Sequence, residues 1–187
     1  MTPKQLRFFV ADPFVGTCLD LVAGYALNKN VRKLASLWAE RLLLTSAPFE
    51  AVSVLVASDE LSELEVLECC GKAFMEVGLL MPASEDTALE LKALAEASKF
   101  LRGTTNRYEF LENFKETHLL PDVLFGLSDL FWLEDGLCYS QENVTVTAID
   151  QRTRKAVDEL INHLTPHLEL LANWMVRLDI KCPPQEE

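Results

Sequence analysis

A heptad pattern in the last quarter of the chain limits what this sequence can fold into. Apolar residues there alternate at intervals of four and three positions: Val157, Ile161, Leu164, Leu168, Leu171, Met175 and Leu178. Such spacing places one apolar stripe along a single face of an α-helix. The pattern therefore predicts one long amphipathic helix over about residues 143–180, with its stripe buried in the fold.

Pro166 interrupts this predicted helix between His163 and His167. At about 100° per residue, Pro166 lies almost opposite the middle of the stripe. The carbonyl of Asn162 loses its N–H partner there, and water can replace that bond on an exposed face. We expect a kink at Pro166 that bows toward solvent.

Residues 144–149 (VTVTAI) alternate between apolar and polar side chains, as a short strand would. The rest of the chain offers no plausible strand to pair with this segment.

Cap and turn signals divide the rest of the chain into short helices. Residues 31–44 and 87–101 are amphipathic, and residues 81–86 (MPASED) form a linker and a cap. Residues 49–58 (FEAVSVLVAS) also suit a strand, but their neighbours favour a helix. Gly71 indicates a close helix approach or a break. The predicted starts and caps are Thr2-Pro3, Asp12-Pro13, residues 28–30, Ser58-Asp59 and the Asn106/Glu109 capping box.

These patterns predict an all-α fold. The chain has 187 residues, of which 49% are apolar and 25% are charged, and this is enough for one packed core. We expect seven to nine helices in a single-domain multi-helix bundle over residues 1–182, with a long C-terminal helix kinked at Pro166. Residues 183–187 form a short acidic C-terminal tail.

The net charge of -12 is concentrated in the later part of the chain. Residues 58–187 hold eleven Lys and Arg against twenty-five Asp and Glu. An acidic surface repels phosphate backbones, so direct nucleic-acid binding is disfavoured, whereas a basic protein partner is compatible. The alternative is that the charge merely keeps an apolar chain in solution.

Cysteine usage indicates the compartment. The five cysteines are odd in number and show no C-x-x-C spacing, which favours a reducing cytoplasm. Asp12 and Pro13 interrupt the apolar N-terminal residues too early for an export signal. No window reaches the ~18 apolar residues that a membrane span needs.

His163 and His167 are the obvious candidates for a metal site, with Glu159 one turn earlier as a third ligand. Helical geometry puts His167 roughly 70° and His163 roughly 110° from the middle of the apolar stripe. The H-E-x-x-H pattern of zinc enzymes and nearby cysteine ligands are both missing from the sequence. We therefore interpret both histidines as residues at the margin of the packed face and expect no metal.

Other motifs for catalysis are weak. Adjacent Cys69 and Cys70 point to different sides of a helix, so we interpret them as small buried apolar residues rather than a redox pair. The sequence contains no G-x-S-x-G turn and no glycine-rich phosphate loop. We assign no catalytic residues and no cofactor.

The segment 119–139 is the most apolar part of the chain, and its apolar residues surround the helix that it predicts. Such a helix is either central to the core or covered by a partner. In the second case an apolar centre with an acidic rim would bind a basic or amphipathic protein. The candidate partner-binding residues are Leu124, Phe131, Trp132, Asp129, Glu134 and Asp135.

Taken together, the sequence favours a non-enzymatic, acidic protein-binding or regulatory protein of the cytoplasm. An adaptor, a dedicated chaperone or an inhibitor of a more basic partner protein all fit. The alternative is a helical enzyme, or a protein that binds a small ligand or metal near His163 and His167. A homo-oligomer paired through the heptad stripe is a third arrangement.

Overall fold

The computed structural model describes residues 1–44, 49–106, 109–110, 113 and 146–180. In these residues all regular structure is helical, which confirms the predicted all-α fold. The elements are α1 (Pro3–Val10), α2 (Pro13–Ala26), α3 (Arg32–Leu43), α4 (Glu50–Val56), η1 (Ser58–Glu60), α5 (Glu63–Val77), α6 (Glu85–Leu101), α9 (Val146–His163) and α10 (Thr165–Arg177).

Side-chain caps start several of these helices where the sequence predicts. Thr2 forms a capping box at α1. Asp12 caps α2 by accepting hydrogen bonds from the amides of Phe14 and Val15 at 2.8 and 3.1 Å. Such caps satisfy backbone N–H groups that have no partner within the helix. The predicted Asn106/Glu109 capping box is also confirmed, with both bonds formed at 3.1 and 3.0 Å.

The predicted cap at Ser58-Asp59 is wrong. These residues form the short 3-10 turn η1, and α5 begins after Ser62, which makes a capping box with Glu65. The hydrogen bonds that the carboxylate of Glu65 accepts from Ser62 lower the pKa of Glu65. Ser58 is fully buried, and its hydroxyl donates to the carbonyl of Arg32 at 3.3 Å. The residue therefore fixes the turn against α3 instead of starting a helix.

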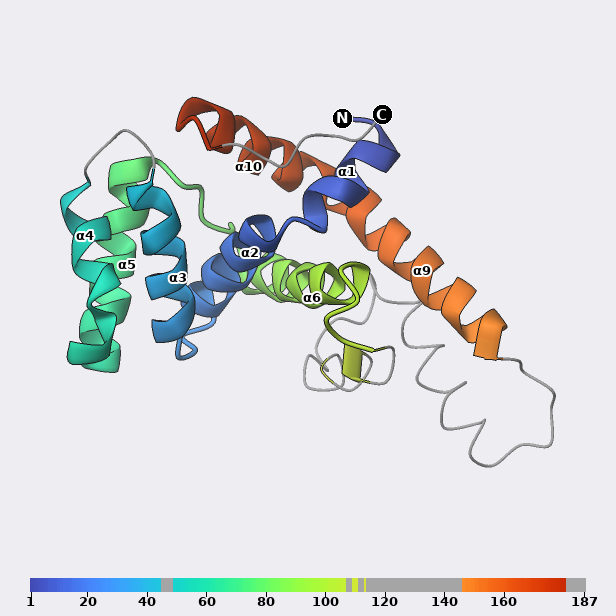
Figure 1. The fold of residues 1–187 in the computed structure, drawn as a ribbon, viewed down its shortest axis with the longest axis horizontal. Coiled ribbons are helices and arrows are strands. Elements are labelled where there is room, and N and C mark those ends of the chain that lie inside the picture. Colours follow the sequence, from blue (N-terminus) through green and yellow to red (C-terminus); the bar gives the residue numbers. More distant parts are fainter. Residues whose placement is uncertain (45–48, 107–108, 111–112, 114–145, 181–187) are drawn as a thin grey trace.

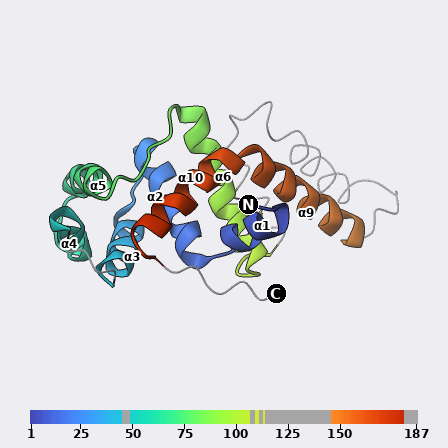
Figure 2. The ribbon, with the colours of Figure 1, turned by 90° about the horizontal axis from the view of Figure 1, so that it is seen from above.

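Three helices, α3, α4 and α5, lie side by side as one group, as Figures 1 and 2 show. Trp38 of α3 is completely buried and packs edge-to-face on Phe74 of α5, with ring centroids 5.4 Å apart. Tyr25 at the end of α2 packs on Phe74 from another side at 5.1 Å. The aromatic side chains therefore join this group to α2.

Gly71 lies against the side chain of Tyr25, and α5 continues through Gly71 without the break that was the other alternative. A Cβ atom at Gly71 would lie 2.7 Å from the hydroxyl oxygen of Tyr25. That distance is far below an ordinary contact, so the phenol would have to move if any larger residue replaced the glycine.

Helices α2 and α6 cross in the middle of the molecule, and α1 and α9 pack against α6 (Figure 1). From above, α10 lies across α2 and α6 (Figure 2). Helix α2 contacts both α3 and α6. It therefore links the α3–α5 group to the rest of the fold.

The heptad stripe is buried as the sequence predicts, with Val157, Ile161, Leu164, Leu168, Leu171 and Met175 in the core and Leu178 packed against it. The prediction of one helix over residues 143–180 is not confirmed. Two helices form instead, and Leu164 separates them with φ -90° and ψ 9°. Residues 146–149 open α9, so the alternative of a strand is wrong for them.

Proline chemistry explains this break. Pro166 has no N–H group to donate to the carbonyl of Asn162. A continuous helix would therefore leave that carbonyl without its helical hydrogen bond. The second position of a new helix has no such bond to lose, and Pro166 occupies that position in α10. Pro166 is exposed, on the side opposite the buried stripe, as the sequence predicts.

Candidate functional site

The three candidate metal ligands face different surroundings. The Nε2 atom of His163 lies 3.4 Å from Oε1 of Glu90, a nearly buried acid of α6. Glu159 pairs with Lys155 at 3.4 Å on an exposed face of α9. His167 lies in α10 and lines a pocket. The structure does not bring His163, His167 and Glu159 together.

The other candidates are placed as follows. In the described part of the chain, no group of three or more His, Cys, Asp or Glu residues is arranged to hold a metal ion. All six candidate partner-binding residues, together with the segment 119–139 and the tail 183–187, lie outside the described residues. A different feature therefore defines the candidate site.

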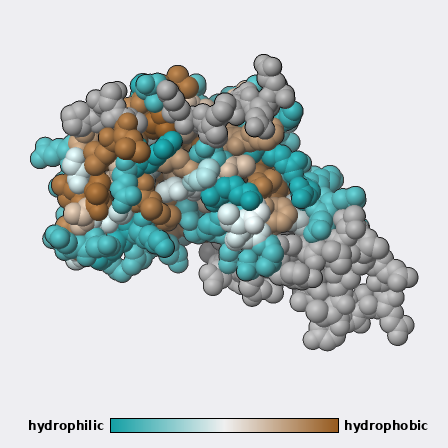
Figure 3. Space-filling model, viewed as in Figure 1, coloured by the Kyte–Doolittle hydropathy of each residue, from teal (hydrophilic) through white to brown (hydrophobic). Residues whose placement is uncertain are grey.

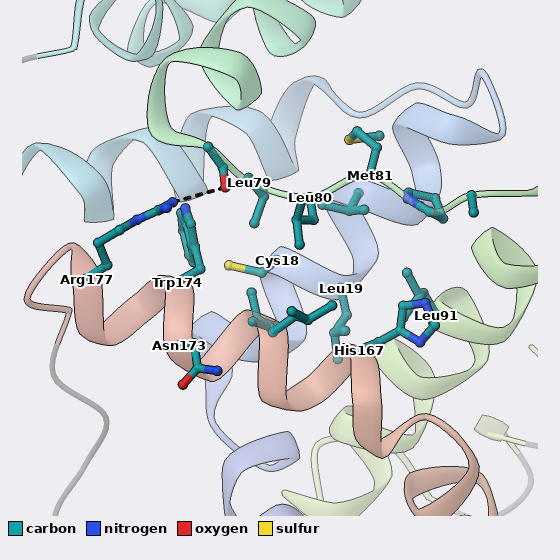
Figure 4. A pocket seen from close by; sticks show the side chains of 16 residues that line it. Cys18, Leu19, Leu79, Leu80, Met81, Leu91, His167, Asn173, Trp174 and Arg177 are labelled. Atoms are coloured by element: carbon teal, nitrogen blue, oxygen red, sulfur yellow. Dashed lines mark hydrogen bonds between the residues drawn. The ribbon is translucent and has the colours of Figure 1, made fainter.

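An apolar pocket of about 460 Å³ lies between α10 and the segment 78–83 that follows α5. Helix α2 contributes Cys18, Leu19 and Val22, and α6 contributes Leu91. Figure 4 shows α10 along one side of the pocket and the segment 78–83 along the other. The pocket is lined by Cys18, Leu19, Val22, Gly78, Leu79, Leu80, Met81, Pro82, Ala83, Leu91, His167, Leu170, Leu171, Asn173, Trp174 and Arg177.

Helix α5 ends at Gly78, and that ending forms the first wall of the pocket. Gly78 takes the left-handed conformation, with φ 65°, that commonly ends helices. The amide of Leu79 still bonds to the carbonyl of Phe74 at 2.9 Å. Pro82 then biases the preceding residue, Met81, toward an extended backbone. Residues 79–82 have no regular structure, and they carry apolar side chains along the pocket.

Helix α10 holds the end of α5 through two side chains. The indole Nε1 of Trp174 donates to the carbonyl of Val77 at 3.0 Å. The guanidinium of Arg177 donates to the carbonyls of Val77 and Gly78, both at 3.1 Å. These bonds satisfy carbonyls at a helix end that have no partner in the helix. They also fix the two walls of the pocket relative to each other (Figure 4).

His167 supplies little chemistry to the pocket. Its Nδ1 atom is buried and makes no hydrogen bond to any residue that the structure describes. In Figure 4 the imidazole lies beside Leu91, at the opposite end of the α10 wall from Arg177. A catalytic histidine needs a partner that orients it or exchanges its proton, and none of the described residues that line this pocket is an acid. The lining suits binding better than catalysis.

A charge cluster of two buried acids and two partly exposed lysines lies at the crossing of α2 and α6, which both line the pocket. The ammonium of Lys92 donates to Asp20, and the ammonium of Lys99 donates to Glu96 at 2.6 Å. Lys99 also lies 3.6 Å from Asp20. The amide of Asn113 donates to Glu96 at 3.0 Å. Two acids and two lysines balance one another, so both carboxylates remain buried with charged partners.

A second, more polar depression adjoins the apolar pocket and shares Pro82 and Ala83 with it. Asn28, at the end of α2, and Ser84 and Glu85, at the start of α6, complete its lining together with Ala26 and Leu27. The two depressions therefore adjoin at Pro82 and Ala83. Among the described residues that line them, Glu85 is the acidic residue of the polar depression and Arg177 is the basic residue of the apolar pocket.

The adjacent cysteines are largely buried. Cys70 is completely buried and Cys69 is half-buried. Burial, together with the neighbouring Cys69, raises the pKa of the Cys70 thiol to about 12. A thiol with so high a pKa stays protonated at neutral pH and is a poor nucleophile. This environment supports the interpretation of Cys70 as a small apolar residue.

Sequence reasoning missed the pocket. The sequence predicts a linker and a cap for residues 81–86, which describes their backbone but not their role as a wall. A usable signal was the apolar run Leu79-Leu80-Met81 directly after a helix-ending glycine, because connecting segments are usually polar. Nothing in the sequence indicates that α10 would lie opposite this run.

The class of protein that this site defines is an all-helical chain with an open apolar pocket at the junction of α2, α6 and α10. None of the described helices is long and apolar enough to cross a membrane. The sequence matches no protein-family model, no curated protein and no solved structure.

Proposed function

We propose that this chain is a non-enzymatic protein-binding or regulatory protein of the cytoplasm, and that its apolar pocket receives an apolar segment of a more basic protein. An adaptor, a dedicated chaperone or an inhibitor would all work in this way. Each masks an apolar segment of its partner by covering it.

Exposed apolar side chains around the pocket carry this proposal. Leu80 is 62% exposed and Leu170 is 49% exposed, and they face the pocket from its two walls. Large apolar side chains that line a concave, open surface favour a partner, because their contact with water is unfavourable. Full burial of one leucine contributes roughly 1.5–3 kcal/mol.

The charge of the chain supports a basic partner. With a net charge of -12 the chain attracts cationic proteins over long distances, which accelerates encounter more than it strengthens the final complex. The pocket would then determine the affinity, and the acidic surface would increase the association rate.

The alternative is a small ligand in the same pocket. Its volume of about 460 Å³ lies in the range of small-molecule sites. Such sites combine an apolar lining with a few converging polar groups. Here Nη2 of Arg177 already donates to Val77 and Gly78, and His167 and Asn173 are the other polar side chains among the described residues of the lining. The mostly apolar lining therefore favours a protein segment over a polar metabolite.

Affinity purification from the native cell, with identification of the bound proteins, tests the proposal when wild type is compared with Leu80→Asp. An aspartate in the apolar wall should remove the partner by placing a charge against its apolar segment. Leu64→Asp is the matched control, since Leu64 is 66% exposed on α5 and does not line the pocket.

Three outcomes distinguish the possibilities. Loss of one basic protein from Leu80→Asp but not from Leu64→Asp supports the proposal. Loss from Leu64→Asp alone moves the binding surface to the α3–α5 group, where Figure 3 shows further apolar residues. Equal recovery of the partner with wild type, Leu80→Asp and Leu64→Asp contradicts the role of the pocket.

A further inference from the structure

We infer that the partner segment binds in an extended conformation and pairs, like an added β-strand, with the backbone of residues 79–81. This inference rests on the proposed function and adds the conformation of the ligand. The inference concerns hydrogen bonds between the main chains of the ligand and the pocket, whereas the proposed function concerns only the apolar side chains that line the pocket.

The segment 79–82 presents unpaired main-chain groups beside the pocket. The amides of Leu80 and Met81 donate no hydrogen bond to any described residue. The segment is short and carries the exposed side chain of Leu80. An exposed chain with unpaired N–H and C=O groups is a template for another strand. A helical ligand, whose backbone groups are already paired, would leave these groups unused.

The length of the groove fits a short strand. His167 and Arg177 lie at the two ends of the α10 wall (Figure 4) and are ten residues apart, about 15 Å at 1.5 Å per residue. An extended chain advances about 3.3 Å per residue. About five ligand residues would therefore span the groove, with alternate side chains pointing into the pocket. The apolar floor from Leu19 and Val22 would receive those side chains.

Charge complementarity sets the composition of the ligand. The groove continues past Pro82 into the polar depression that Glu85 lines. Glu85 is exposed, and Asp86 follows it in the first turn of α6. The ligand is therefore an apolar stretch from a basic protein, with Lys or Arg at the end that lies beside Glu85.

Selection of binders from a random library of twelve-residue peptides tests this inference on the whole chain. Leu80→Asp serves as the counter-selection protein, so that only pocket binders are kept. Extended binding predicts apolar residues at every second position, next to Lys or Arg. Helical binding predicts apolar residues three and four positions apart. The spacing in the selected peptides therefore reports their bound conformation.

Backbone methylation of a selected peptide gives the sharper readout. A strand pairs through only one edge, so N-methyl groups on one set of alternate residues should weaken binding at least tenfold. Methyl groups on the other set should change it less than about threefold, because those amides point away from the protein. Consecutive amides of an extended segment point to opposite edges, and the amide of Leu79 already bonds to Phe74, so Leu80 carries the amide that can pair. Leu80→Pro removes this amide and Leu80→Ala keeps it. Leu80→Pro should bind about three- to tenfold more weakly than Leu80→Ala, as expected for one hydrogen bond.

The outcomes separate the inference from the proposed function. Two results together support both the inference and the proposed function: selected peptides with apolar residues at every second position, and weaker binding when only one of the two sets of alternate amides is methylated. Helical spacing, or an equal effect of the two methylated sets, overturns strand pairing while the pocket remains a protein-binding site. A library that yields no peptide preferring wild type over Leu80→Asp overturns both.

Discussion

The indole of Trp174 donates a hydrogen bond to the carbonyl of Val77 at 3.0 Å, across 97 residues of sequence. The bond joins α10 to the end of α5, and the ring of Trp174 also lines the pocket. One side chain therefore supports both the fold and the candidate site.

Substitutions at Trp174 separate its hydrogen bond from its packing. Trp174→Phe keeps most of the apolar surface but loses the donor, so we expect the free energy of unfolding to fall by about 1 kcal/mol. Trp174→Ala also leaves a cavity in a buried site and should lower it by about 3–5 kcal/mol. Urea unfolding followed by circular dichroism measures both. A Trp174→Phe protein as stable as wild type would show that the bond to Val77 contributes nothing.

Gly78 and Gly103 form a matched pair for testing the contact between α5 and α10. Both have positive φ, 65° and 69°, so alanine at either position costs about 1–2 kcal/mol of backbone strain. A Cβ at Gly78 would also lie 2.7 Å from the guanidinium of Arg177, whereas Gly103 has nothing within 4 Å. We expect Gly78→Ala to destabilise the fold more than Gly103→Ala in urea unfolding. In an Arg177→Ala background the difference should shrink, and an unchanged difference would contradict the role of Arg177.

The raised pKa of Cys70 makes stability fall at alkaline pH. The thiol ionises near pH 9.0 in the unfolded chain but near 12 in the folded one. The folded state therefore holds the proton more tightly, and its advantage is complete below about pH 9 and is lost as the pH rises toward 12. We expect the free energy of unfolding to drop more steeply between pH 9 and 11 in wild type than in Cys70→Ala. Parallel pH profiles of the two proteins would contradict the burial of this thiol.

His163 should matter more for stability than Glu159. His163→Ala removes the neighbour of Glu90, a carboxylate that is only 9% exposed, and should cost about 1 kcal/mol in urea unfolding. Glu159→Ala breaks only an exposed pair with Lys155 and should cost less than about 0.5 kcal/mol. If the two residues instead shared a metal ion, both variants would be equally unstable, and EDTA would lower the melting temperature of wild type.

Local rules predicted the features of this fold that depend on residues close together in the sequence. The heptad stripe fixed which face of α9 and α10 is buried, and the Asn106/Glu109 pattern identified a capping box. Both features follow from the geometry of a single helix. Gly71 indicated only that something lies close to α5, and the sequence did not identify Tyr25 as the neighbour.

Tertiary contacts decided the features that sequence reasoning missed. Ser58 looks like a helix cap, but its hydroxyl bonds to Arg32 in α3, so the start of α5 moves to Ser62. Asp20 lies in an apolar segment, and only the crossing of α2 and α6 brings Lys92 to it. The pocket has the same origin, since its walls come from residues about 90 positions apart in the sequence. No local pattern encodes such pairings.

Hydrogen–deuterium exchange of the chain, alone and saturated with its co-purified partner, tests the central claim most directly. The amides of Leu80, Met81 and Ala83 have no partner among the described residues, so they should exchange fast in the free chain. We predict that the partner slows exchange in residues 79–83 and in α10. Protection confined to α3, α4 and α5, or no protection at residues 79–83, would contradict the account.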